Sequence, residues 1–166
     1  MKPKLAILCA DTYGKEFFRL LLLRLKDDRL LPNFSFALDR FYGPCNTKLE
    51  RQMRVFAYVR QINAFLVFVD ADGKPQEKIR KDVACHVEPQ LIASTRIIIF
   101  RYEIEDWICI SKGIRIKDEK PSIILSRKEK YEKYKLPEYA AQLDIRKLTN
   151  ECESFREFLE FAQSIR

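Results

Sequence analysis

The sequence predicts an α/β fold with a mainly parallel sheet of about four strands, flanked by helices on both faces, and a basic helical C-terminal extension. Three observations favour this Rossmann-like architecture. Four short apolar runs alternate with amphipathic segments of helical length. The run Ala64–Asp70 is apolar up to its last residue, as expected of a strand buried on both faces. Crossover helices return successive strands to the same direction, so the alternation predicts parallel pairing.

The first strand and helix are expected near the N-terminus. Residues 5–9 are all apolar and predict a short buried strand. A helix from about Gly14 to Asp28 follows, because apolar side chains recur there every three or four positions. These side chains are Phe17, Phe18, Leu21, Leu22 and Leu25. An apolar face of this width is expected to pack on a sheet.

The second strand and helix follow the same order. Alternating apolar residues predict a strand over residues 34–38, and Tyr42-Gly43-Pro44 predicts a loop. Thr47 and Glu50 have the spacing of a capping box, in which each side chain bonds the other residue's backbone N–H. The helix that they open has apolar residues at Leu49, Met53, Phe56 and Val59.

The third and fourth strands complete the core. After Ala64–Asp70, Pro75 suits the first turn of a helix, where its missing N–H leaves no bond unmade. The apolar residues of that helix are Ile79, Val83 and Val87. Thr95–Phe100 predicts the fourth strand, and Trp107 beyond it is expected in the core.

The C-terminal part differs in composition. Residues 112–147 hold eleven Lys or Arg against six Asp or Glu, with three tyrosines among them. Ser154 and Glu157 then form a second capping box, before an apolar stripe at Phe155, Phe158, Leu159 and Ala162. We expect a single domain over residues 1–166, with a core at about 1–111 and an extension at about 112–166 that packs on it.

Composition narrows the class of protein. The net charge of +7 favours contact with phosphates or an acidic partner. Five cysteines, odd in number and without a CxxC pair, indicate neither a disulfide framework nor a zinc ribbon, and are expected as buried reduced thiols. The first apolar segment is too short for a signal peptide or a membrane span, so we expect a cytoplasmic protein with no membrane partner.

Acidic side chains follow three of the four predicted strands. Asp11 follows the first, Asp70 and Asp72 follow the third, and Glu103 and Glu105 follow the fourth. The carboxyl ends of parallel strands meet at one edge, which is where open α/β sheets bind ligands. Carboxylates as close as Asp70 and Asp72 repel by roughly 1 to 4 kcal/mol, so a cation is expected to neutralise them. Oxygen ligands suit Mg²⁺, or Mn²⁺ in its place.

These residues give a candidate site for metal-assisted phosphodiester chemistry. We expect Asp11, Asp70 and Asp72 to be catalytic, and the same three residues with Glu103 and Glu105 to hold the metal. Contacts to nucleic-acid phosphate are expected from Lys15, Lys74, Arg101, Lys112, Arg127 and Lys128. Asp11 also suits a helix cap, and Asp106 favours the start of the following helix.

Five segments carry a resemblance to a known family. The sequences ADTYGKEFF (residues 10–18) and VDADG (residues 69–73) look like the two motifs of Toprim domains, the catalytic fold of topoisomerases, primases and recombination proteins. The sequences FRYEIEDW (100–107), LPEYAAQLD (136–144) and CESFREFL (152–159) resemble a prokaryotic Toprim-like family of unknown function. That family is related to the overcoming-lysogenization-defect nucleases, and the resemblance spans nearly the whole chain.

The resemblance implies a compact parallel sheet with Mg²⁺ on Asp70 and Asp72. Asp11 would take the place of the family's acidic residue after the first strand, a general acid or base or a further metal ligand. Toprim domains have Glu-Gly there, whereas this chain has Asp11-Thr12. Asp reaches one methylene less far, and a misplacement of about 1 Å can lower a rate on the order of a hundredfold. Membership also implies an ATPase partner subunit of the kind found in defence systems.

Three functions therefore stand open. The first is a Mg²⁺-dependent nuclease or related phosphotransfer enzyme. The second is a catalytically weak binding or regulatory subunit with the same fold, which the altered first motif favours. The third is a haloacid-dehalogenase-type phosphatase with Asp70 as nucleophile, but Lys74 stands where that class has a hydroxyl. An EF-hand is excluded because the twelfth position from Asp70 is Lys81.

Overall fold

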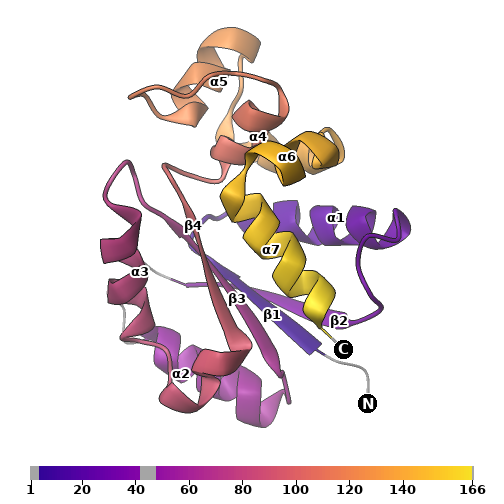
Figure 1. The fold of residues 1–166 in the computed structure, drawn as a ribbon, viewed down its shortest axis with the longest axis vertical. Helices are drawn as coiled ribbons and strands as arrows, with labels where there is room; N and C mark the ends of the chain where they lie inside the picture. The colour runs from indigo at the N-terminus through magenta and orange to yellow at the C-terminus, as the bar shows by residue number, and fades with distance from the viewer. Residues whose placement is uncertain (1–3, 42–47, 166) are drawn as a thin grey trace.

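The sheet has four parallel strands in the order β2-β1-β3-β4, which confirms the predicted α/β class (Figure 1). The computed structural model describes residues 4–41 and 48–165. The strands are β1 (Lys4–Cys9), β2 (Ser35–Arg40), β3 (Ala64–Asp70) and β4 (Thr95–Phe100). The two central strands, β1 and β3, are buried on both faces, which explains their unbroken apolar sequences.

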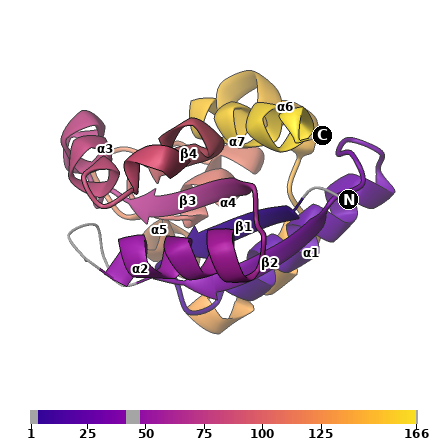
Figure 2. The ribbon, with the colours of Figure 1, turned by 90° about the horizontal axis from the view of Figure 1, so that it is seen from below.

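Helices cover both faces of the sheet, as Figures 1 and 2 show from two directions. On one face lie α1 (Gly14–Asp27) and α7 (Glu153–Ser164). On the other lie α2 (Lys48–Arg54), which continues as a π-helical turn (Val55–Val59), and α3 (Gln76–Ala84). Side chains alternate between the two faces along each strand, so each face has its own apolar core.

The extension contributes to one of these cores. After α4 (Glu105–Ser111) the chain forms α5 (Pro121–Glu129), a 3₁₀ segment (Lys133–Ala141) and α6 (Ile145–Glu151). Leu125, Leu136 and Leu148 from these elements are fully buried, in the same cluster as β1 and β3. The basic segment therefore has an apolar inner side.

Trp107 lies at the centre of this core and is fully buried. Its ring packs edge-on against Phe100 at 5.1 Å and Phe155 at 4.9 Å between ring centroids. Its indole N–H donates to Ser154 Oγ at 2.9 Å. The predicted capping role of Ser154 is wrong, because α7 begins one residue earlier and the hydroxyl is instead used by the indole.

Two smaller predictions need correction. Val59 is 74% exposed, because α2 widens into a π-helical turn that shifts the phase of the apolar stripe. Cys85 is exposed, whereas Cys9, Cys109 and Cys152 are buried free thiols. The predicted loop at residues 42–44, Thr47 of the first capping box and Cys45 lie outside the described residues. No helix in the described ranges has the length and apolar character that crossing a membrane requires.

The packing of Trp107 gives a test of the core. We expect Trp107→Ala to lower the free energy of unfolding by about 3 to 5 kcal/mol, because it leaves a large cavity among aromatic rings. Urea unfolding followed by circular dichroism measures this. The control Val59→Ala, at an exposed position, is expected to change the free energy by less than about 0.5 kcal/mol. A loss below about 1 kcal/mol for Trp107→Ala would contradict the assignment of this core.

Candidate active site at the switch point of the sheet

The neighbouring strands β1 and β3 define a topological switch point. From β1 the chain crosses over one face through α1 to β2, and from β3 it crosses the other face through α3 to β4. Such crossovers leave a crevice outside the carboxyl ends of the two central strands, where ligands of α/β proteins bind. Asp11 lies just beyond β1, and Asp70 is the last residue of β3.

The two carboxylate oxygens of Asp11 have different kinds of partner. Its Oδ1 accepts hydrogen bonds from the backbone N–H of Tyr13 at 2.7 Å and of Gly14 at 3.0 Å, which fixes the start of α1. Its Oδ2 lies 2.6 Å from the Nζ of Lys133. Gly14 permits this turn, since a Cβ there would lie 3.0 Å from Cys9 Sγ and 3.1 Å from the Asp11 Cβ. Asp11 is thus both a cap and the partner of a cation.

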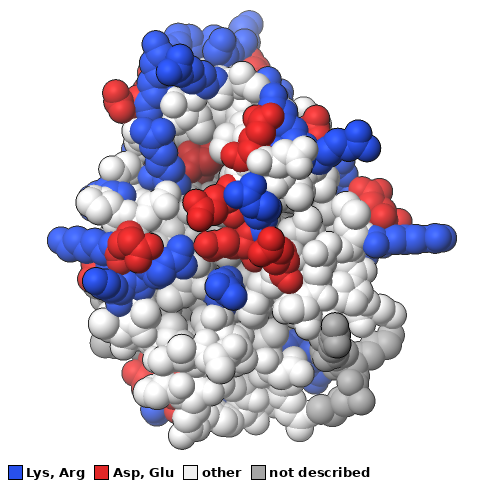
Figure 3. Space-filling view, in the orientation of Figure 1, with Lys and Arg blue, Asp and Glu red and all other residues white. Residues whose placement is uncertain are grey.

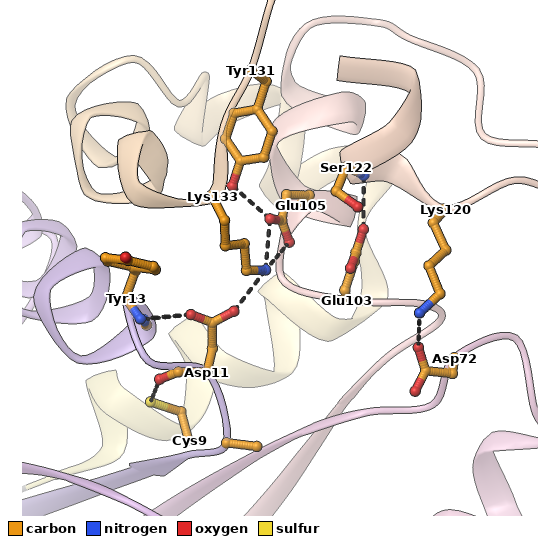
Figure 4. A network of polar contacts seen from close by, with 12 residues as sticks. Cys9, Asp11, Tyr13, Asp72, Glu103, Glu105, Lys120, Ser122, Tyr131 and Lys133 are labelled. Atoms are coloured by element: carbon orange, nitrogen blue, oxygen red, sulfur yellow. Dashed lines mark hydrogen bonds and ion pairs between the residues drawn. The ribbon is translucent and has the colours of Figure 1, made fainter. Parts of the chain in front are cut away.

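Glu105 holds the same cation from the other side (Figure 4). Its two carboxylate oxygens lie 2.7 and 2.9 Å from Lys133 Nζ, and Tyr131 donates its hydroxyl to Oε1 at 2.5 Å. Burial raises the pKa of Glu105, and Lys133 opposes this shift. Burial lowers the pKa of Lys133, but Glu105 and Asp11 more than offset this, so its pKa is raised and the ammonium form persists.

Asp70 shares this environment without a direct partner. It makes no hydrogen bond or ion pair through its side chain within the residues that the structure describes. Its pKa is raised to about 8, mainly by burial; Lys133 lowers the pKa, and the negative charges of Asp11, Glu105 and Glu103 contribute to raising it. The carboxyl group of Asp70 therefore gains and loses its proton near neutral pH.

Asp72 and Glu103 point to other partners. Asp72 has a left-handed backbone with φ of 50°, and its half-exposed carboxylate lies 2.7 Å from Lys120 Nζ. This turn ends the strand alternation, which would have placed Asp72 on the same side as Asp70. Glu103 accepts a hydrogen bond from the Ser122 N–H at 2.7 Å, at the start of α5. In Figure 4 both residues lie to one side of the cluster around Lys133.

The Asp106 carboxylate is buried at the start of α4 and bonds the preceding loop. Its Oδ2 accepts from the Tyr102 N–H at 2.9 Å, while Oδ1 is buried and has no hydrogen-bond partner among the described residues. Burial raises the pKa of Asp106 to about 7, against the effect of backbone N–H groups. It lies in the first turn of α4, where the sequence placed it.

The carboxylate oxygens at the switch point are of the kind that binds hard cations, but the ammonium group of Lys133 lies between them. No three Asp, Glu, His or Cys side chains of residues 4–41 and 48–165 are grouped as metal ligands. Asp11 and Glu105 nevertheless converge on one positive charge. Mg²⁺ is commonly held by one or two carboxylates together with waters and substrate phosphates. Asp11 and Glu105 therefore supply the one or two carboxylates that Mg²⁺ needs, and Lys133 supplies the positive charge between them.

Most of the predicted phosphate-binding residues are partly neutralised. Four have acidic neighbours within 4 Å, and these pairs are Lys15–Asp39, Arg101–Asp118, Lys112–Glu129 and Arg127–Glu119. Lys74 and Lys128 are exposed and make no ion pair with the described part of the chain. Figure 3 shows that Lys and Arg side chains gather over α5. Exposed pairs contribute little and leave their cations available to phosphates, whereas the Lys112 and Glu129 side chains are only 29% and 27% exposed.

No sequence pattern indicated Lys133 or Tyr131 as a site residue. Lys133 is one of eleven cations in residues 112–147, and its neighbours form no motif. Its role depends on the path of the extension, which brings the chain back across the ends of β1 and β3. The only available signal was the opposite charge of Lys133 and Asp11, which lie far apart in the sequence.

No known protein-family model, curated protein or solved structure matches this chain.

The environment of Asp70 predicts a stability effect that depends on pH. The folded state holds the Asp70 proton up to about pH 8, whereas an unfolded Asp loses it near pH 3.9, so this group lowers stability as pH rises between these values. We expect Asp70→Asn to be more stable than the wild type at pH 9, by about 1 to 3 kcal/mol, with no gain at pH 3.

Urea unfolding in chelator at several pH values measures this difference. The matched control Asp72→Asn removes an exposed pair with Lys120 and is expected to show no gain at high pH. A stability difference for Asp70→Asn that does not vary with pH would contradict the assignment.

Proposed function

We propose that this protein is a Mg²⁺-dependent phosphodiester-transfer enzyme of Toprim-like fold that acts on nucleic acid, most simply as a nuclease. The proposal rests on one observation above all: Asp11 and Glu105, which follow different strands, hold a single cation between them at the switch point. A site that already binds a positive charge through carboxylates has the chemistry that Mg²⁺ or Mn²⁺ needs. The Toprim-like motifs support the same function, although they place the metal on Asp70 and Asp72.

The side chains would have distinct roles. Asp11 and Glu105 would hold the metal, and Asp70 completes the acidic site. When bound, Mg²⁺ polarises a phosphoryl oxygen and lowers the pKa of a coordinated water. Asp70, with a pKa of about 8, is suited to take up or release a proton near neutral pH. Asp11 is less suited to proton transfer, because both of its oxygens are already in use.

Nucleic acid would approach from the side of the extension. Residues 112–147 carry an excess of five positive charges, counted as eleven Lys or Arg less six Asp or Glu. Within this segment Arg115, Lys117 and Lys128 are exposed and have no ion pair to a described acid. Cations of this kind bind the phosphate backbone without regard to sequence, and such binding weakens as salt rises.

A second function is favoured by the same lysine. A permanently held Lys133 would make a divalent ion unnecessary, and the chain would then be a metal-independent binding or regulatory subunit with a Toprim-like fold. An ATPase partner of the defence type, implied by the resemblance, belongs with this alternative. It predicts nucleic-acid binding that persists in chelator and no turnover in any metal.

A nuclease assay separates the two functions. We expect the wild-type protein with Mg²⁺ or Mn²⁺ to nick or cut DNA or RNA, and Asp70→Asn to lose at least about a hundredfold in rate, since it removes a group for proton transfer. The control Asp118→Asn, whose side chain is fully exposed, is expected to keep the wild-type rate. Because Asp70→Asn is expected to be more stable than the wild type, unfolding would not explain its loss. Absence of turnover in every metal would favour the second function.

Metal titration tests which carboxylates bind the ion. The motif resemblance assigns the metal to Asp70 and Asp72, whereas the geometry favours Asp11 and Glu105. We expect Glu105→Gln to weaken Mn²⁺ binding at least about tenfold in calorimetry, because a neutral amide is a poorer ligand for a hard cation. Asp72→Ala is expected to leave the affinity within about threefold of the wild type. The reverse order of effects would restore Asp72 as the principal ligand.

A further inference from the structure

Lys133 reaches the switch point from a short segment of the extension. Residues 130–133 join α5 to the 3₁₀ segment and bring two side chains to Glu105 (Figure 4). Lys133 lies between Asp11 and Glu105, and Tyr131 donates to Glu105. Among the described residues, no other basic side chain is paired with either carboxylate. The positive charge at this position comes from a segment that is remote in sequence.

The exposed fraction of the side chain decreases from Lys133 to Asp11 to Glu105. The Lys133 side chain is 38% exposed, that of Asp11 is 9% exposed, and that of Glu105 is fully buried. The lysine is therefore the solvent-facing member of the group. The carboxylates of Asp11 and Glu105 are thus less exposed than the lysine side chain that pairs with them.

The Lys133 ammonium can move away from Asp11 and Glu105 only if another cation takes its place. Without a counter-ion, the carboxylates of Asp11 and Glu105 would stand buried and uncompensated beside Asp70, which is strongly unfavourable. A divalent cation in the same position would satisfy them with more charge than the ammonium provides. The lysine and such a cation are thus competitors for the same oxygens.

The segment has attachments that permit the exchange. Lys130 has a left-handed backbone with φ of 56°, where α5 ends. Ser126 Oγ donates to the Tyr131 carbonyl at 2.6 Å, and Lys135 Nζ donates to the Lys130 carbonyl at 3.1 Å. These bonds hold the backbone and leave the Lys133 side chain, with its four-carbon stem, able to turn away by rotation alone.

We infer that residues 130–133 form a plug whose Lys133 ammonium is the built-in counter-ion of the switch point, and that a divalent cation enters only by displacing it. The inference rests on the proposed function, because it takes Asp11 and Glu105 as the metal ligands. It adds that metal binding moves the Lys133 ammonium to the solvent side of the site. There it can pair with a phosphate of bound nucleic acid, so metal and substrate are expected to bind cooperatively.

The first test replaces the plug. Lys133→Met keeps much of the side-chain length and removes the charge, and Lys78→Met is the matched control at an exposed position of α3 that has no ion pair to a described acid. In calorimetric titration with Mn²⁺, we expect Lys133→Met to bind at least about tenfold more tightly than the wild type, and Lys78→Met to match the wild type. Equal or weaker binding by a folded Lys133→Met would overturn the plug.

The second test uses the wild-type protein and does not depend on the folding of a variant. Acetylation of each lysine is followed by mass spectrometry, with and without Mg²⁺. An ammonium held between carboxylates reacts slowly, so displacement by Mg²⁺ is expected to raise the reaction rate of Lys133 at least about threefold relative to Lys128. An unchanged rate for Lys133 at every Mg²⁺ concentration would overturn the plug.

The outcomes separate this inference from the proposed function. Tighter metal binding by Lys133→Met without cleavage of any nucleic acid would keep the plug and remove the nuclease. Metal-dependent cleavage by the wild type, with no change in Lys133 reactivity, would keep the nuclease and remove the plug.

Discussion

The structure depends on one buried arrangement of charge, the ammonium of Lys133 between the carboxylates of Asp11 and Glu105. Acidic side chains that meet at the end of a parallel sheet repel each other, and their repulsion grows as water is excluded. A cation at their centre is what makes the convergence tolerable. The extension supplies that cation, so it is as much a part of the site as the strands that deliver the acids.

The sheet could be predicted from the sequence because parallel strands leave a clear pattern. Ala64–Asp70 and Thr95–Phe100 match β3 and β4 residue for residue, since continuous apolar runs bounded by polar residues have few other uses in a protein of this size. The strand order β2-β1-β3-β4 was not among the predictions. Because the carboxyl ends of parallel strands meet at one edge, the acids that follow β1, β3 and β4 could be assigned to that edge from the sequence alone.

The finer arrangement at that edge could not be predicted. Asp70 and Asp72 are one residue apart, yet a left-handed turn at Asp72 directs its carboxylate to Lys120. Spacing in sequence determines which side chains share a face only while the backbone stays extended. The role of Lys133 could not be predicted from local sequence patterns for a different reason. Its contacts depend on how the extension folds back over the core.

Trp107 links the acidic site to the end of the chain. It lies two residues after Glu105 in the same short helix, and its ring is enclosed by Phe155 and Phe158 of α7. During synthesis the four strands are complete well before those phenylalanines leave the ribosome, so the part of the sheet face that α7 covers beside α1 stays exposed until α7 emerges. The nascent chain therefore exposes apolar surface between the synthesis of β4 and that of α7, a stage at which binding by a chaperone would protect it from aggregation.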